Sequence, residues 1–261
     1  MRSILIFLLL FISKASYQQV AFDYQRDFKM ILEKSQDKGG ALYYQKLLIR
    51  FLDNDSSLTR AETLALMIGY TENKDYKPYK DMGSEKEIFD LNEAGEYQDA
   101  LDASKEYLQK HPLSLRILKE RSYSYHQVKK EDSAKYFMDL VDKIMGAMIY
   151  SGKGRKMETA IFSLGLSDGE YFVANIGMTA ANKNTGWDAH KNFLFIVDAL
   201  SDDGEHSNFF FNIHHAKIKI EDDVDEDTAD PKSKKKGKKK GKDVKTVKPV
   251  TDSIPTPQDK N

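Results

Sequence analysis

The spacing of apolar residues changes once along this 261-residue chain, and that change limits the folds open to it. Between residues 21 and 146, apolar side chains recur at helical spacing, as at Phe28, Ile31 and Leu32. After a glycine-containing break at residues 151–154, short runs rich in Phe, Ile and Val are typical of strands instead. We therefore predict an α+β fold, in which a helical layer (residues 17–150) packs on an antiparallel β-meander (residues 151–220).

Helix starts are marked in the first half of the chain. Thr59 with Glu62, and Ser84 with Glu87, fit the capping box, in which the hydroxyl accepts from an early backbone N–H and the carboxylate reaches back to the cap. The spacing predicts helices that start at both places, and Gly69 is placed to end the first of them.

A tetratricopeptide-like pattern occupies residues 94–146. Gly95 and Ala100 are small where two helices would approach, and Pro112 follows where a helix would end. Ala134 stands one repeat period, 34 residues, after Ala100. An ordinary antiparallel helix hairpin fits the same residues, so both interpretations stay open.

The predicted meander has four strands joined by turns. We predict these strands at residues 157–166, 170–177, 192–200 and 209–220. Ser167-Asp168-Gly169 supplies a hairpin turn between the first two strands. Residues 178–191, which include Trp187, are predicted as a longer connection.

The predicted hairpin turn lies within residues 165–169, whose sequence matches the Gly-x-Ser-x-Gly pattern of serine hydrolases. That chemistry requires the serine on a strand-to-helix turn, with a histidine and an acid brought to it. Because both flanks are predicted as strands, we interpret Ser167 as a turn residue and keep a hydrolase as the alternative. The histidines that could serve it downstream are His190, His206, His214 and His215. No cofactor and no metal site is predicted.

Residues 70–83 are predicted as a long loop with several aromatic side chains. Tyr70, Tyr76 and Tyr79 could stack on a sugar or a peptide, and they are the candidate binding residues of the folded part. The competing interpretation is that these rings cover the neighbouring helices of their own chain.

Residues 221–261 offer almost nothing to bury, so a disordered tail is predicted. Six acids stand in residues 221–227 and eight lysines in residues 232–242. The lysines would attract an anionic polymer or a membrane surface, unless the nearby acids neutralise them. The candidate binding residues in this tail are Lys234, Lys235, Lys236, Lys238, Lys239 and Lys240.

Residues 1–16 have the composition of a signal peptide. Arg2 precedes an apolar run at residues 4–12, which is too short to span a bilayer, and cleavage is expected near Ala15 or Ser16. The mature chain is then periplasmic or secreted, with no integral membrane span left. The chain has no cysteine, which excludes disulfides, a lipid-anchor cysteine and a thiol nucleophile.

In this order, the segments between residues 28 and 213 resemble an exported family of Gram-negative bacteria called domain of unknown function 4919. The likeness rests on Leu58-Thr59, Ile68-Gly69-Tyr70, Tyr76-Lys77-Pro78-Tyr79, Ser151-Gly152-Lys153-Gly154, Glu170-Tyr171 and Phe211-Asn212-Ile213. The resemblance implies localisation in the cell envelope and carries no activity. It also implies O-glycosylation at Asp-(Ser/Thr)-aliphatic tripeptides, with Thr228 and Ser253 as candidate sites.

We predict a non-catalytic exported protein of the cell envelope that binds another envelope protein or a peptide, or scaffolds an assembly. Helical hairpins offer grooves for peptides, and no residue type in a suitable pattern supplies a general base or nucleophile. The two alternatives are a hydrolase that uses Ser167 or a histidine, and a protein that binds polyanions or surfaces through its lysine-rich tail.

Overall fold

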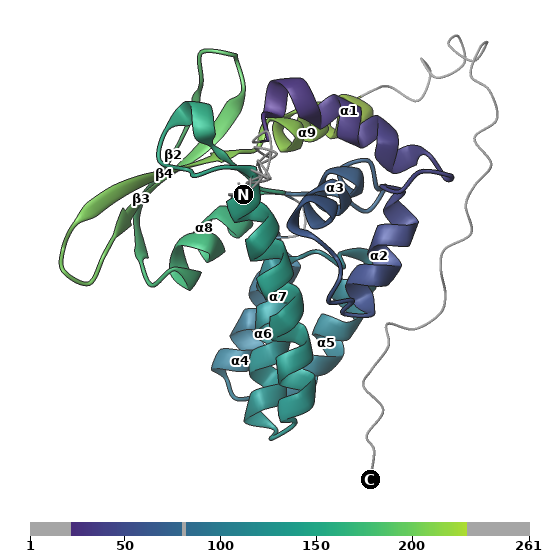
Figure 1. Ribbon diagram of the computed structural model, residues 1–261. Helices are drawn as coiled ribbons and strands as arrows, with labels where there is room; N and C mark the ends of the chain where they lie inside the picture. The colour runs from purple at the N-terminus through teal and green to yellow at the C-terminus, as the bar shows by residue number, and fades with distance from the viewer. Residues whose placement is uncertain (1–21, 80–81, 229–261) are drawn as a thin grey trace, which may run out of the picture.

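The computed structural model describes residues 22–79 and 82–228 and has an α+β fold, as predicted (Figure 1). The helical half contains α1 (Tyr24–Gln36), α2 (Tyr44–Leu52), α3 (Arg60–Tyr70), α4 (Met82–Glu93), α5 (Tyr97–Lys110), α6 (Leu115–Gln127) and α7 (Glu131–Ser151). The second half contains the short 3-10 helix η1 (Met157–Thr159), β1 (Ile161–Phe162), α8 (Leu166–Asn175), β2 (Thr179–Trp187), β3 (Phe193–Leu200), β4 (His206–Asn212) and α9 (His214–Thr228). The predicted signal peptide, the six candidate lysines and Ser253 lie outside the described residues.

The sheet is mixed, with strand order β1-β4-β3-β2. Strands β2, β3 and β4 form an antiparallel meander, with Val197 opposite both Lys183 and Phe209, but only β3 and β4 correspond to strands of the predicted meander. The two-residue strand β1 instead pairs in parallel with β4, with Ile161 opposite Phe211. The chain therefore reaches the far side of β4 before it builds the meander.

Several predicted strand boundaries in this half are wrong. The strand predicted at 157–166 is the 3-10 helix η1 followed by the two-residue strand β1. The hairpin turn at Ser167-Asp168-Gly169 and the strand at 170–177 are the helix α8, whose buried residues Asp168, Gly169, Phe172 and Val173 recur at helical spacing. The predicted connection at 178–191 contains the strand β2, and the predicted strand at 209–220 stops at residue 212. The helix α9 then runs to residue 228, past the predicted start of the tail at 221.

Of the two predicted helix starts, the one at Thr59 is correct and the one at Ser84 is wrong. Thr59 caps α3, and Glu62 completes the capping box, as predicted. Ser84 instead lies inside α4, which begins two residues earlier. Gly69 also lies inside its helix, where a Cβ would meet the Ser35 side chain at 3.0 Å, so this glycine allows α1 to pack closely on α3.

Helices α4 to α7 form two consecutive helical hairpins. The helix α4 packs on α5 and α6, and α6 packs on both α5 and α7. Ala100 and Ala134 are both buried, and the chain turns at Gly95 with φ +79°. A hairpin arrangement is therefore present, while its relation to tetratricopeptide repeats stays a prediction.

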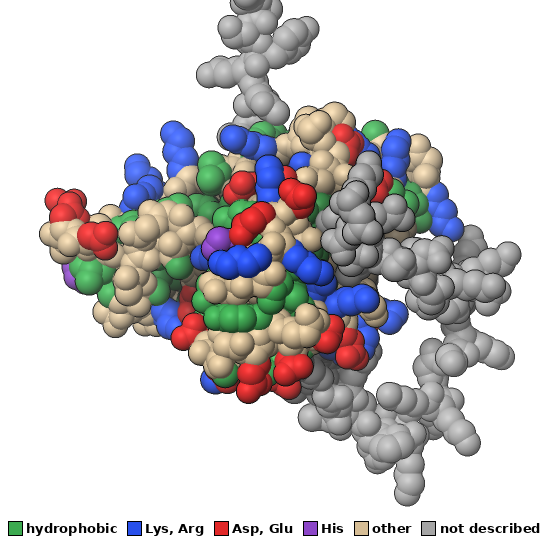
Figure 2. All heavy atoms as spheres, turned by 90° about the horizontal axis from the view of Figure 1, so that it is seen from below, with side chains coloured by type: hydrophobic (Ala, Val, Ile, Leu, Met, Phe, Trp, Pro, Cys, Tyr) green, Lys and Arg blue, Asp and Glu red, His purple; other side chains and the backbone are tan. Residues whose placement is uncertain are grey.

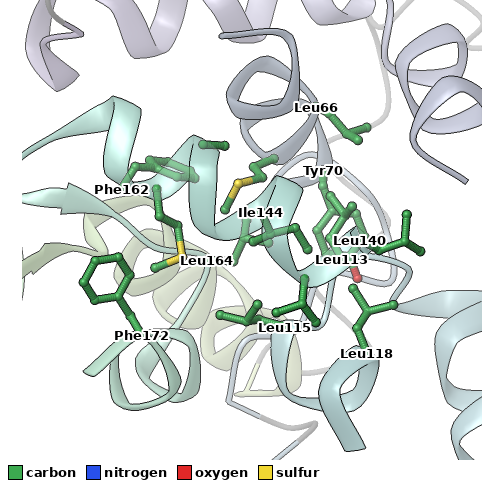
Figure 3. Packing of buried hydrophobic residues seen from close by; sticks show 14 of the residues in the cluster. Leu66, Tyr70, Leu113, Leu115, Leu118, Leu140, Ile144, Phe162, Leu164 and Phe172 are labelled. Atoms are coloured by element: carbon green, nitrogen blue, oxygen red, sulfur yellow. The ribbon is translucent and has the colours of Figure 1, made fainter. Parts of the chain in front are cut away.

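The helical half and the sheet share one hydrophobic core. Side chains from α3, α6 and α7 meet those of Phe162 on β1 and Phe172 on α8 (Figure 3). Phe137, Ile144 and Phe211, which come from α7 and β4, are fully buried in the same cluster. The two halves predicted from the sequence are therefore packed as one unit.

The surface of the described part carries both positive and negative side chains. On the face that Figure 2 shows, Lys and Arg side chains are interspersed with Asp and Glu and with exposed apolar groups, so no field of one sign covers that face. Of the helices that the structure describes, none combines the length and apolar character required to cross a membrane.

Candidate functional site

A small cleft of about 50 Å³ lies where the loop after α3 meets α4, the α5–α6 turn and the start of α8. Segments far apart in the sequence therefore build one site. Its lining residues are Tyr70, Tyr76, Lys77, Pro78, Met82, Glu85, Tyr107, His111, Leu113, Ser114, Leu164, Gly165, Ser167 and Asp168. Three of them, Tyr70, Leu113 and Leu164, also belong to the core in Figure 3, so the cleft wall is anchored in that core.

Glu85 is the most unusual acceptor in this cleft. Its side chain is buried, at 7% exposure, on the first turn of α4. Its Oε1 accepts hydrogen bonds from Ser114 Oγ at 2.8 Å and from the Tyr107 hydroxyl at 3.2 Å. Its Oε2 is buried and has no hydrogen-bond partner within the described residues. One half of the carboxylate is thus held in place, and the other half is buried beside the cleft without a hydrogen bond in the described part of the chain.

Asp168 is a second buried carboxyl group at the same cleft. Burial, and secondarily the negative charge of Glu85, raise the pKa of Asp168 to about 8, while the Leu164 amide opposes the shift by donating to its Oδ2 at 3.2 Å. Asp168 is therefore mostly protonated at neutral pH, and Glu85 and Asp168 form an unequal pair of carboxyl groups.

The aromatic loop contributes to the cleft but mainly covers its own chain. Tyr76 is buried and donates to the Leu164 carbonyl. The Tyr70 hydroxyl donates to the Lys110 carbonyl at 3.2 Å. Tyr70 and Tyr76 line the cleft, and Tyr79 is half-buried against the core without lining it. The binding role of these tyrosines stays a prediction.

Ser167 lies on a strand-to-helix segment, because β1 precedes it and it is the second residue of α8. The hairpin turn predicted at Ser167 is therefore wrong. Its backbone nonetheless lacks the left-handed φ of a strained nucleophile turn, which among described non-glycine residues occurs at Asn54, Lys129 and Lys191. Gly169 is required for packing instead, since a Cβ there would meet Phe195 at 2.9 Å.

The four downstream histidines have contacts of their own elsewhere in the described part of the chain. His206 Nδ1, at the start of β4, is 2.9 Å from an Asp198 oxygen on β3, and His214 Nδ1 accepts from the Phe193 amide at 3.3 Å. His215 is stacked among buried rings, and His190 is exposed. Of the residues described, none of these four lines the cleft.

Among the described residues that line the cleft, the histidine is His111, which no motif in the sequence marked as a candidate. Its pKa is lowered chiefly by burial, so it is neutral at pH 7. Glu85 and Asp168 were missed for a related reason. Each is an ordinary acid in the sequence, near a predicted cap or a predicted turn, and only the packing of α4 against α8 gives it a function. No signal in the sequence alone marks this convergence.

The other candidates are structural or fall outside the description. Ser151 Oγ accepts from the Phe162 amide at 2.8 Å, and Gly154 accepts from the Phe210 amide at 2.8 Å, so the glycine-containing break is bonded to the sheet region. In residues 22–79 and 82–228 no group of three or more His, Cys, Asp or Glu side chains could hold a metal ion.

Comparison with known proteins gives one result. No curated protein and no solved structure matches this chain. The model of a family described as a domain of unknown function, DUF4919, matches residues 29–222, which is most of the chain and agrees with the resemblance seen in its short segments. On that match, this chain belongs to the family of domain of unknown function 4919.

Proposed function

We propose that this chain is a non-catalytic protein that binds a partner through the cleft between the α3–α4 loop and α8. One observation carries the proposal: the buried Glu85 Oε2 lacks a hydrogen-bond partner among the described residues. A buried acceptor left without a donor costs about 1–3 kcal/mol, and more when it is charged. A bound group that donates to this oxygen removes that cost.

The volume of the cleft limits the kind of partner. About 50 Å³ accommodates the end of one side chain, whereas pockets for whole small molecules are about 300–1,000 Å³. The partner is therefore a protein or peptide that inserts one group. This agrees with the expectation of an envelope protein or peptide as the ligand.

The site of action that we propose is the cell envelope, on the basis of the signal-like residues 1–16. Cell fractionation of the full chain, compared with a chain lacking these residues, tests this part. We expect the full chain outside the cytoplasm and the shortened chain inside it. Equal distribution of both would contradict export.

The binding proposal is tested by filling the cleft. Ser167→Phe places a ring in the cleft, and Thr185→Phe, on the exposed face of β2, is the matched control. Crosslinking in intact cells, followed by quantitative mass spectrometry, should recover a partner with the parent and the control and lose it with Ser167→Phe. A partner retained equally by all three chains would exclude this cleft as the binding site.

A hydrolase is the second candidate, favoured by one observation. Ser167, His111 and Asp168 line the same cleft, and Ser167 follows a strand and begins a helix. A fluorophosphonate probe, which phosphonylates an activated serine with loss of fluoride, should then label the parent and not Ser167→Ala. Absence of labelling in the native parent removes this candidate.

A further inference from the structure

We propose that the cleft takes the ammonium group of a lysine side chain from the partner, with the Glu85 carboxylate as its counter-ion. This inference rests on the proposed function, because it names the group that the cleft binds.

The hydrogen bonds of Glu85 call for a donor. Ser114 and Tyr107 both donate to Oε1, so the carboxylate is held in one orientation before a ligand arrives. The other oxygen is buried and has no partner in the described part of the chain. A ligand group that meets this oxygen has to carry N–H or O–H.

Charge selects a cation among such donors. Both groups that donate to Glu85 are neutral hydroxyls, so the described contacts stabilise its charge without neutralising it. Hydrogen bonds between ionised partners are about twice as strong as bonds between neutral partners. A cationic donor therefore gains more at Glu85 than an amide or a hydroxyl does.

Among cationic groups, the size and the lining residues of the cleft favour an ammonium on a narrow aliphatic chain. The cleft offers about 50 Å³, whereas one water molecule needs about 10–15 Å³ on the same measure, so an ammonium group fits. Tyr70, Tyr76 and Tyr107 line the cleft, and aromatic rings favour cations at short range. The methylene stem of a lysine would contact Pro78 and Met82, which are also lining residues.

Lys77 allows a test of the sign of the ligand charge, because it is the lysine among the described residues that line the cleft. Its positive charge would oppose a second ammonium in the same cleft. Removing the charge of Lys77 should therefore strengthen binding, whereas removing the charge of Glu85 should weaken it. An anionic ligand would give the opposite pair of effects.

The experiment titrates the purified protein with α-N-acetyl-lysine-N-methylamide and follows amide chemical shifts by NMR. The norleucine analogue and the Nε-acetylated lysine analogue keep the stem without the charge. Glu85→Gln and Lys77→Gln are compared with Glu87→Gln, which changes the same charge at an exposed position on α4. Circular dichroism checks that each variant is folded.

We expect saturable shifts at the cleft with the lysine probe only, an at least tenfold loss of affinity in Glu85→Gln, a gain in Lys77→Gln and no change in Glu87→Gln. No binding, equal binding of norleucine, or tighter binding to Glu85→Gln would overturn the inference. Lys77→Gln keeps it testable if Glu85→Gln is unfolded. If Ser167→Phe still abolishes partner crosslinking while the lysine probe fails, the proposed function stands and this inference alone falls.

Discussion

Asp168 illustrates how one buried residue couples folding to pH. The pKa of its carboxyl is raised to about 8, chiefly by burial, from 3.8 in the unfolded chain. The protonated form is thus preferred on folding, so its contribution to stability is complete below pH 4 and is lost as the pH rises through 8. Asp168→Asn keeps an acceptor for the Leu164 amide and removes the titration. We expect the variant to gain roughly 3–4 kcal/mol over the parent at pH 7 and little at pH 4.

Urea unfolding from pH 4 to pH 8 measures this difference. Asp142→Asn, at an exposed position on α7, is the control and should follow the parent. A constant offset between Asp168→Asn and the parent across this range would contradict the assignment.

His215 should give the opposite dependence. It stacks on Phe162 at 4.6 Å and on Phe28 at 5.5 Å between ring centroids, and burial lowers its pKa to about 3 from 6.5. The neutral form is preferred on folding, so this contribution is complete above pH 6.5 and falls as the pH drops toward 3. Between pH 7 and pH 5, the buried imidazole should lower the free energy of unfolding by about 2 kcal/mol.

His215→Phe should remove that cost and, relative to the parent, gain stability as the pH falls. Denaturant midpoints at pH 7, 6 and 5 measure it, with His190→Phe at an exposed position as the control. As the pH rises, the contribution of Asp168 to stability falls and that of His215 grows. Each single variant therefore shows the pH dependence that the other group causes. If the denaturant midpoints of His215→Phe and the parent change in parallel with pH, the pH dependence does not come from His215.

At the scale of elements, α8 packs closely on the sheet because Gly169 has no side chain. A Cβ at Gly169 would lie 2.9 Å from Phe195 and 3.1 Å from Phe211. Gly169→Ala should therefore destabilise the protein by about 1–3 kcal/mol despite the higher helix propensity of alanine. Gly83, in α4, has no atom within 4 Å of its Cβ position and is the matched control. Thermal unfolding should show Gly83→Ala unchanged or more stable, and equal effects of the two variants would contradict the packing argument.

The elements that could be predicted are those whose burial follows one period. Helices α2, α5 and α7 each bury one stripe, whereas α3 is buried at every position from 63 to 70. The strand β3 alternates, with Phe195, Val197 and Ala199 buried on one face. The strand β2 is mostly exposed, so nothing apolar marks it. In α9, Ile218 and Ile220 suggest alternation, although the buried residues, Ala216 among them, follow the helix. The site residues Glu85 and His111 depend on contacts between elements, which no local period reports.

At the scale of the whole molecule, the shared core predicts a single unfolding transition. Ile144, on α7, is fully buried in the cluster that joins the helices to the sheet. Ile144→Ala should cost about 2–5 kcal/mol. The midpoint of unfolding should fall by the same amount whether it is followed by Trp187 fluorescence, which reports the end of β2, or by helical circular dichroism. Ile149→Ala, at 52% exposure on the same helix, should have little effect. Separate transitions for the two signals would show two independent units.

The pairing of α1 with α9 has a consequence for biosynthesis. Tyr24 contacts His215 across 191 residues of sequence, Gln25 donates to Asn192 Oδ1 at 2.7 Å, and the two helices lie together in Figure 1. A ribosome adds about 5–20 residues per second, so the first helix waits on the order of ten seconds or more for its partners to be synthesised. During that interval α1 has α3 to pack on, but the side of α1 that meets His215 through Tyr24 is uncovered, and a chaperone that holds nascent chains has time to bind there.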